Sequence, residues 1–263
     1  MGKHSPSACE TCPVNAVSKL ERLGMKLGGT DFVIALAGNP NTGKSTIFNA
    51  LTGLRQHTGN WPGKTIARAE GAFSVGGKRY KIVDLPGTYS LLSATDDEEV
   101  AREFILFGRP DVTVVVIDAT RIERNLNLVL QVLQITDRAL VCVNLIDEAE
   151  AHGITVDGRG LARDLGVPVV LTAARRGRGV EQLVNAIDDM ANGRTPCSPH
   201  RLKYEVPGLR EAMEEMTAAL EAAYPRVPHR DWIAMRLLEG DPRVAEAVAS
   251  GAIGSLETDH AAS

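Results

Sequence analysis

The motif GNPNTGKS, residues 38–45, constrains this chain most, because it follows the strand-like run FVIALA and precedes the helical pattern STIFNALTG. A Gly, four residues and Gly-Lys-Ser is the spacing of a phosphate-binding loop between a strand and a helix. Such a loop aims backbone N–H groups and a helix N-terminus at phosphate oxygens. We expect Lys44 to reach the β- and γ-phosphates and the Ser45 hydroxyl to bind Mg²⁺. The motif predicts a nucleoside triphosphate site and does not identify the base.

Residues 31–195 alternate strand-like runs with helical or loop segments; the further runs are KRYKIVDLPG, VTVVVIDA, RALVCVNLID and VPVVLTA. This alternation predicts an α/β P-loop GTPase fold, a mostly parallel sheet with helices on both faces and ligands at the carboxyl ends of its strands. A Gly/Pro/Ser-rich linker begins near residue 192, and three helical patterns follow it. We therefore expect an extension over residues 1–30, a G domain over 31–195 and a small all-α domain over 196–263.

Composition narrows the class of protein. The 44% hydrophobic and 24% charged residues are typical of a globular chain, and the formal charge of −4 disfavours nucleic acid as a partner. The longest apolar runs have the length of strands, and the first residues lack a secretory signal, so we expect a cytoplasmic chain. The four cysteines, at positions 9, 12, 142 and 197, do not resemble a dense disulfide framework, and Cys142 lies in a predicted buried strand, so we expect reduced thiols.

Further motifs follow the phosphate loop at the ends of predicted strands. Asp84 in DLPG is placed to hold Mg²⁺ through water, and the N–H of Gly87 to meet the γ-phosphate. Asp147 in NLID can accept both the ring N1–H and the exocyclic amine of guanine, a donor pair that adenine lacks. The alternative for Asn144 and Asp147 is a helix N-cap pair. The turn after the next strand offers the N–H of Ala174 to guanine O6, so the motifs together predict a GTPase.

The segment QHTGNWPGKTIARAEG, residues 56–71, resembles the first switch of the bacterial ferrous iron transport protein B family. Other segments resemble the same family, and together they cover most of residues 31–185. They are DLPGTYSLLSATDDEEVARE, NLIDEAEAHGITVD and LGVPVVLTAARRGRGV. The resemblance implies the cytosolic part of a membrane transporter, at the cytoplasmic face of the bacterial inner membrane. It also implies that the helical domain acts like a GDP-dissociation inhibitor and links to a membrane transport domain of the same polypeptide. We expect the chain to be a fragment, and leave open a homo-oligomer.

The resemblance also implies roles for single residues. Thr65 would join the Mg²⁺ shell through its hydroxyl, and Asn41, with Gly59 and Trp61, would bind K⁺ beside the phosphates. The alternatives are that Asn41 only hydrogen-bonds within its loop and that Trp61 is a hydrophobic anchor. Thr88 stands where many GTPases carry a water-orienting glutamine, which predicts hydrolysis that is slow or differently assisted.

The expected catalytic residues are Asn41, Lys44, Thr65 and Gly87, and the expected Mg²⁺ ligands are Ser45, Thr65 and Asp84. The expected nucleotide-binding residues are Gly38, Asn39, Pro40, Asn41, Thr42, Gly43, Lys44, Ser45, Thr46, Gly63, Lys64, Thr65, Asp84, Leu85, Pro86, Gly87, Asn144, Leu145, Asp147, Thr172, Ala173 and Ala174. Leu145 stands where many GTPases carry a lysine, which predicts weaker stacking on the base and faster exchange. Ala173 stands where a serine is usual, so the side-chain support of that turn is absent.

Cys9 and Cys12 form a Cys-x-x-Cys pair near His4. Even with the histidine, these side chains supply one ligand fewer than a tetrahedral zinc site needs, so a metal or redox role competes with an exposed tail.

The combined prediction is a GTP-hydrolysing switch module that couples its nucleotide state to Fe²⁺ uptake, with Mg²⁺ and possible K⁺ as cofactors. Two alternatives remain open: a soluble GTPase associated with the ribosome or tRNA, and a slow sensor of nucleotide state.

Overall fold

The computed structural model describes residues 28–54, 56–92, 95–201 and 208–256. They form two compact units, one ending at Arg201 and one made by residues 208–256. His4, Cys9 and Cys12 lie outside the described residues.

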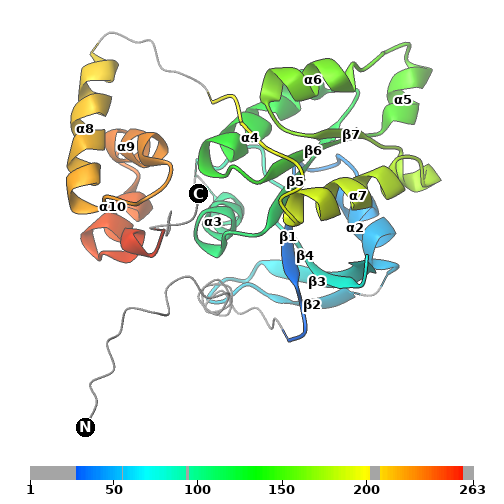
Figure 1. Ribbon diagram of the computed structural model, residues 1–263, viewed down its shortest axis with the longest axis horizontal. Coiled ribbons are helices and arrows are strands. Elements are labelled where there is room, and N and C mark those ends of the chain that lie inside the picture. The colour runs from blue at the N-terminus through cyan, green and yellow to red at the C-terminus, as the bar shows by residue number, and fades with distance from the viewer. Residues whose placement is uncertain (1–27, 55, 93–94, 202–207, 257–263) are drawn as a thin grey trace. The chain divides into compact units, whose positions relative to one another are not determined.

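A seven-stranded sheet in the order β2-β3-β4-β1-β5-β6-β7 forms the centre of the first unit (Figure 1). Five strands run parallel, namely β1 (Phe32–Gly38), β4 (Lys78–Asp84), β5 (Val112–Asp118), β6 (Ala139–Asn144) and β7 (Val169–Leu171). These are the five strands that the apolar runs predict, and the mostly parallel sheet is confirmed.

Two further strands were not predicted. β3 (Ala67–Val75) pairs antiparallel with β4, and β2 (Gln56–Asn60) pairs antiparallel with β3 at the sheet edge. All residues of β2 are exposed, so its sequence QHTGN lacks the alternation of a half-buried strand. The resemblance describes this stretch as a switch, and in this structure much of the switch is a strand.

Helices cover both faces of the sheet, as predicted. Their bounds are α2 (Lys44–Thr52), α3 (Asp96–Glu103), α4 (Ile122–Ile135), α5 (Ile146–Ala151), α6 (Gly158–Leu165) and α7 (Val180–Ala191), with a π-helical turn η1 (Phe104–Gly108) and a 3₁₀ turn η2 (Ala174–Arg176). α2 and α7 bury Phe48, Leu183 and Ile187 against one face of the strands. α4 lies over the opposite face, where Leu128 and Val129 are buried (Figure 1).

Within the described residues of the second unit, the regular secondary structure is all helical. It consists of α8 (Leu209–Ala223), α9 (Arg230–Leu238), α10 (Pro242–Ala249) and a 3₁₀ turn η3 (Ala252–Leu256). Its buried apolar side chains are Leu220, Val227, Trp232, Ile233, Ala234, Met235, Val244 and Ile253. Asp241 caps α10 by accepting from the N–H groups of Arg243 at 3.0 Å and Val244 at 3.2 Å.

The predicted boundary at residue 195 stays a prediction. In the structure the chain continues along the first unit beyond that point, because Ser198 N–H donates to the Gly166 carbonyl at 3.0 Å and Arg201 Nε to the Leu133 carbonyl at 3.0 Å. No helix in the described part of the chain has both the length and the apolarity needed to cross a membrane.

Candidate functional site

The phosphate loop joins the end of β1 to the start of α2. Asn41 and Gly43 both have a left-handed backbone, with φ of 66° and 78°, and Thr42 Oγ1 donates to the Asn39 carbonyl at 2.9 Å. Asn39 is buried, and its two amide atoms have no hydrogen-bond partner among the described residues. A buried amide without a partner is uncommon in proteins, and this one lies inside the predicted ligand-binding loop.

Lys44 is the first residue of α2, and its ammonium contacts the end of β4. Nζ pairs with the carboxylate of Asp84 and donates to the Leu85 carbonyl at 2.7 Å. Burial raises the pKa of the Asp84 carboxyl above its usual range, and the Lys44 ammonium opposes that shift. Ser45 and Thr46 are exposed in the first turn of α2. The lysine, the hydroxyl and the carboxylate that Mg²⁺ and phosphate require thus lie at one edge of the sheet.

The segment after Asp84 returns to the phosphate loop. Thr88 N–H donates to the Gly38 carbonyl at 3.3 Å, and Gly87 passes close to Pro40. Leu85 is buried and Pro86 half-buried. Thr88 is buried, with 4% of the residue exposed.

Asn144, the last residue of β6, ties the guanine motif to the phosphate loop. Its Nδ2 donates to the Thr42 carbonyl at 3.1 Å. Its Oδ1 accepts from Thr172 Oγ1 at 3.0 Å and from the Ala174 N–H at 3.1 Å. The expected N-cap alternative is wrong, because the N-cap of α5 is Leu145 and no side chain caps that helix.

Asp147 lies in the first turn of α5 and contacts Arg176, a residue outside the predicted site. Arg176 Nε is 2.8 Å from Asp147 Oδ2. Leu145, just before the helix, has a left-handed backbone with φ of 63°. Ala173 and Ala174 are buried in the turn that leads to Arg176. The doubled arginine after Ala174 is the signal that points to this contact, since either cation could reach the carboxylate.

The loop of the switch segment, residues 61–66, follows β2 and is held by its own contacts. Trp61 N–H donates to the Ile66 carbonyl at 3.0 Å, and the Trp61 ring meets the edge of Phe104 with centroids 5.4 Å apart. Lys64 directs its ammonium to Asp96 at 2.6 Å and Glu99 at 3.1 Å, and these hydrogen bonds raise its pKa.

Gly59 lies in β2, and Gly63 has a left-handed backbone with φ of 70° in the loop that follows. Thr65 is exposed in that same loop, and within the described residues no hydrogen bond joins it to the phosphate loop. The Asn41 side chain likewise makes no hydrogen bond to another described residue, so the within-loop alternative finds no support.

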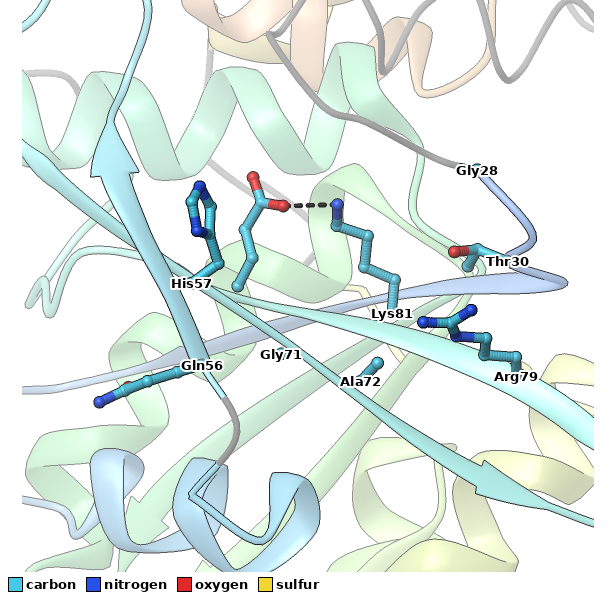
Figure 2. A pocket seen from close by; sticks show the side chains of 9 residues that line it. Gly28, Thr30, Gln56, His57, Gly71, Ala72, Arg79 and Lys81 are labelled. Carbon is cyan, nitrogen blue, oxygen red and sulfur yellow. Dashed lines mark ion pairs between the residues drawn. The ribbon is translucent and has the colours of Figure 1, made fainter.

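A separate pocket of about 360 Å³ lies over strands β2, β3 and β4 (Figure 2). Its polar lining includes Gln56, His57, Glu70, Arg79 and Lys81. Lys81 Nζ pairs with Glu70 Oε2 at 2.5 Å, an ion pair that a dashed line from Lys81 marks in Figure 2, so these opposite charges already satisfy each other. None of the predicted site residues lines this pocket.

Comparison with known proteins connects these motifs to one family. The family model described as ferrous iron transport protein B matches residues 32–187. The Fe(2+) transporter FeoB of Salmonella typhimurium strain LT2 is 41% identical over 230 residues, which cover 86% of this chain and 29% of that protein. This chain thus spans less than a third of the length of that relative.

Two solved structures resemble most of the chain. The cytosolic domain of the T. maritima FeoB iron transporter in its GDP form I has a TM-score of 0.75 and 34% identity, covering 87% of this chain and 88% of that one. The cytosolic domain of L. pneumophila FeoB has a TM-score of 0.74 and 31% identity, covering 86% of this chain and 90% of that one. Because the family model matches more than half of the sequence, the chain belongs to the ferrous iron transport protein B family.

Proposed function

We propose that this chain binds GTP and hydrolyses it to GDP and phosphate, as the nucleotide-dependent module of a ferrous iron transporter. The observation that carries the proposal is that the two ends of the Asn144 amide bond different segments: Nδ2 donates to Thr42 in the phosphate loop, and Oδ1 accepts from Ala174 in the predicted guanine turn. A single side chain thereby sets the distance between groups for phosphate and groups for a base. The relatives named for FeoB, including one in a GDP form, support the same function.

At the phosphate end of the proposed site, positive charge and backbone N–H groups would hold the phosphates in place. Lys44 at the start of α2 would exchange its contacts with Asp84 and the Leu85 carbonyl for phosphate oxygens. Ser45 and Asp84, with Thr65 from the switch loop, would hold Mg²⁺, whose charge stabilises the phosphates. Their oxygen donors suit this hard cation. The N–H of Gly87, beside Pro40, would meet the γ-phosphate.

The water-orienting group of many GTPases has no counterpart at Thr88, whose side chain is buried. We propose that K⁺, bound with Asn41, supplies positive charge beside the phosphates; the unengaged, exposed Asn41 side chain supports this assignment. The carbonyl of Trp61 and the backbone of Gly59 are further proposed ligands. The buried Thr88 also favours the second candidate function, a slow sensor of nucleotide state.

A GTPase assay with Mg²⁺ separates these functions. We expect the wild-type chain to turn over GTP several-fold faster in K⁺ than in Na⁺, and Asn41→Ala to abolish that difference. Lys44→Ala should remove activity in both salts. Equal, very slow turnover of wild type and Asn41→Ala in both salts, with GDP retained, would select the slow sensor.

The link to iron is tested in a longer protein, since this chain spans less than a third of its curated relative. We propose that the nucleotide state of this module, at the cytoplasmic face of the inner membrane, controls Fe²⁺ movement through a membrane domain. A chimera that carries this chain in place of the matching part of the Salmonella transporter should restore Fe²⁺ uptake to a strain without that transporter. The same chimera with Lys44→Ala should not.

A further inference from the structure

The ion pair between Asp147 and Arg176 places a guanidinium on the carboxylate that is proposed to read the base. Arg176 Nε lies 2.8 Å from Asp147 Oδ2. The Asp147 side chain is 16% exposed and that of Arg176 is 72% exposed, so the arginine approaches the carboxylate from the solvent side. Both residues belong to the elements that would flank a bound base, Asp147 to α5 and Arg176 to η2.

The chemistry of the two possible partners of Asp147 is alike. The edge of guanine that a carboxylate reads is a planar N–C–N unit with adjacent N–H donors, the ring N1–H and the exocyclic amine. The arginine guanidinium is also a planar N–C–N unit with adjacent N–H donors. An ionised carboxylate is an acceptor only, and it is satisfied by either group.

From this we propose that Arg176 is an internal competitor of guanine for Asp147, which must be displaced before the base can bind. The proposal rests on the proposed function, because Asp147 must be the group that reads the base. The competition lowers affinity for guanine nucleotides, and it helps a nucleotide to leave, because Arg176 satisfies the carboxylate as soon as the base departs.

The exposure of Arg176 limits how much its competition with guanine can lower the affinity for GDP. Exposed ion pairs contribute at most about 1 kcal/mol, which corresponds to about a fivefold change in an equilibrium constant. Salt screens such a pair, so the competition weakens as ionic strength rises.

Arg175 and Arg178 are suitable controls. Arg178 donates to Glu150 at 2.8 Å, and both control arginines are exposed in the same turn. Arg175→Ala, Arg176→Ala and Arg178→Ala each remove one positive charge close to the site, so all three lose similar general attraction for an anionic nucleotide. Only Arg176→Ala removes the competitor.

The experiment measures association, dissociation and Kd of a fluorescent GDP analogue by stopped flow, with Mg²⁺, at low and high KCl. We expect Arg176→Ala to bind GDP about two- to fivefold more tightly than Arg175→Ala and Arg178→Ala, with slower dissociation and with a gain that shrinks at high KCl. An affinity equal to that of the controls, or weaker, would overturn the proposal; weaker binding would make Arg176 a residue that positions Asp147.

A second variant separates this inference from the proposed function. Asp147→Asn presents an amide donor, which should weaken GDP binding at least tenfold and favour xanthosine diphosphate, whose carbonyl replaces the exocyclic amine. If Asp147→Asn behaves in this way and Arg176→Ala matches the controls, only the competitor is refuted. If wild type binds GDP no better than ADP, or Asp147→Asn leaves base preference unchanged, the guanine assignment itself fails.

Discussion

Asn144 donates from Nδ2 to the carbonyl of Thr42 at 3.1 Å, although the two residues are 102 positions apart in the sequence. The amide is buried at 1% exposure, so its partners cannot be replaced easily by bulk water. Removing one partner leaves the others unsatisfied, which costs about 1–3 kcal/mol for a buried polar group. We predict that Asn144→Ala lowers the free energy of unfolding by about 2–3 kcal/mol without nucleotide, measured by urea denaturation.

Asn127→Ala is the matched control, because Asn127 lies exposed on α4 and its two hydrogen bonds are long and weak, at 3.4 Å each. Its effect on stability should stay within about 0.5 kcal/mol. Asn144→Ala should also weaken GDP binding more than Asn127→Ala does, since the phosphate loop loses its link to the base turn. Equal stabilities for the two variants would show that the Asn144 network does not support the fold.

Gly43 gives a second test of the contact between the phosphate loop and Asn144. A Cβ added at Gly43 would lie 2.3 Å from Asn144 Nδ2, and the residue has φ of 78°. At Gly153 φ is 73°, but an added Cβ would meet nothing within 4 Å. We predict that Gly153→Ala costs about 1–2 kcal/mol of stability for its left-handed backbone alone.

Gly43→Ala should cost about 1–3 kcal/mol more than Gly153→Ala, because the clash forces Asn144 or the loop to move. Thermal and urea unfolding of both variants measure this difference. Similar costs at the two positions would mean that the loop relaxes freely around Asn144.

The sequence predicts those parts of the structure that carry a local apolar pattern or motif. It does not predict the parts that depend on pairing with another segment. β1, β5 and β6 are predictable because buried strands read as continuous apolar runs, whereas β4 (KRYKIVD) is recognised by the short apolar run that ends in the DLPG motif. The motifs at the carboxyl ends of the parallel strands meet at one edge by topology alone. β2 was not predictable, because its exposed sequence QHTGN carries no periodic signal and is ordered by pairing with β3. The Arg176 contact was also missed, since nothing in the spacing indicates which of two adjacent arginines turns toward Asp147.

The hydrogen bond from the Tyr80 hydroxyl to Asp188 joins β4 to α7 and predicts a pH dependence. This bond is the largest cause of the lowered pKa of Asp188, and burial raises the pKa of Tyr80 to about 12. Because the folded pKa of Asp188 is depressed, its stabilisation is present above the ordinary value of 3.8 and is lost as pH falls through the folded pKa. Because the folded pKa of Tyr80 is raised, the stability that its neutral hydroxyl contributes is lost only as pH rises from the ordinary value of 10.0 toward about 12.

We therefore predict that Asp188→Asn lowers stability by about 1 kcal/mol near pH 7, and that the difference from wild type vanishes at strongly acidic pH. Tyr80→Phe keeps the ring stacked on Phe73, at 5.0 Å between centroids, and removes the hydroxyl, which donates to Asp188 and accepts from Asn192 Nδ2 at 3.4 Å. A double-mutant cycle of the two substitutions, followed by urea unfolding from about pH 2 to pH 8, measures the coupling on both sides of the depressed pKa of Asp188. A coupling that does not change with pH would contradict the prediction.

Trp61 tests whether the switch loop depends on the ring as an anchor or on the backbone as a cation ligand. The ring is 4% exposed, packs on Phe104 and lies under the guanidinium of Arg68 at 5.3 Å. Its Nε1 has no hydrogen-bond partner within the described residues, so a phenyl ring loses no bond there. We predict that Trp61→Phe costs less than about 1.5 kcal/mol and Trp61→Ala about 3 kcal/mol, measured by urea unfolding.

The same pair of variants separates the two roles in the GTPase assay. Trp61→Phe retains both the anchor and the backbone carbonyl, so we expect it to keep the stimulation of GTP hydrolysis by K⁺ over Na⁺. Trp61→Ala loses the anchor, and the loop that closes through the Trp61 N–H and the Ile66 carbonyl should open, which limited proteolysis between Asn60 and Ala67 would detect. If Trp61→Ala keeps both the protease resistance and the K⁺ stimulation of wild type, the ring does not order the switch, because alanine retains none of the ring's contacts with Phe104 and Arg68.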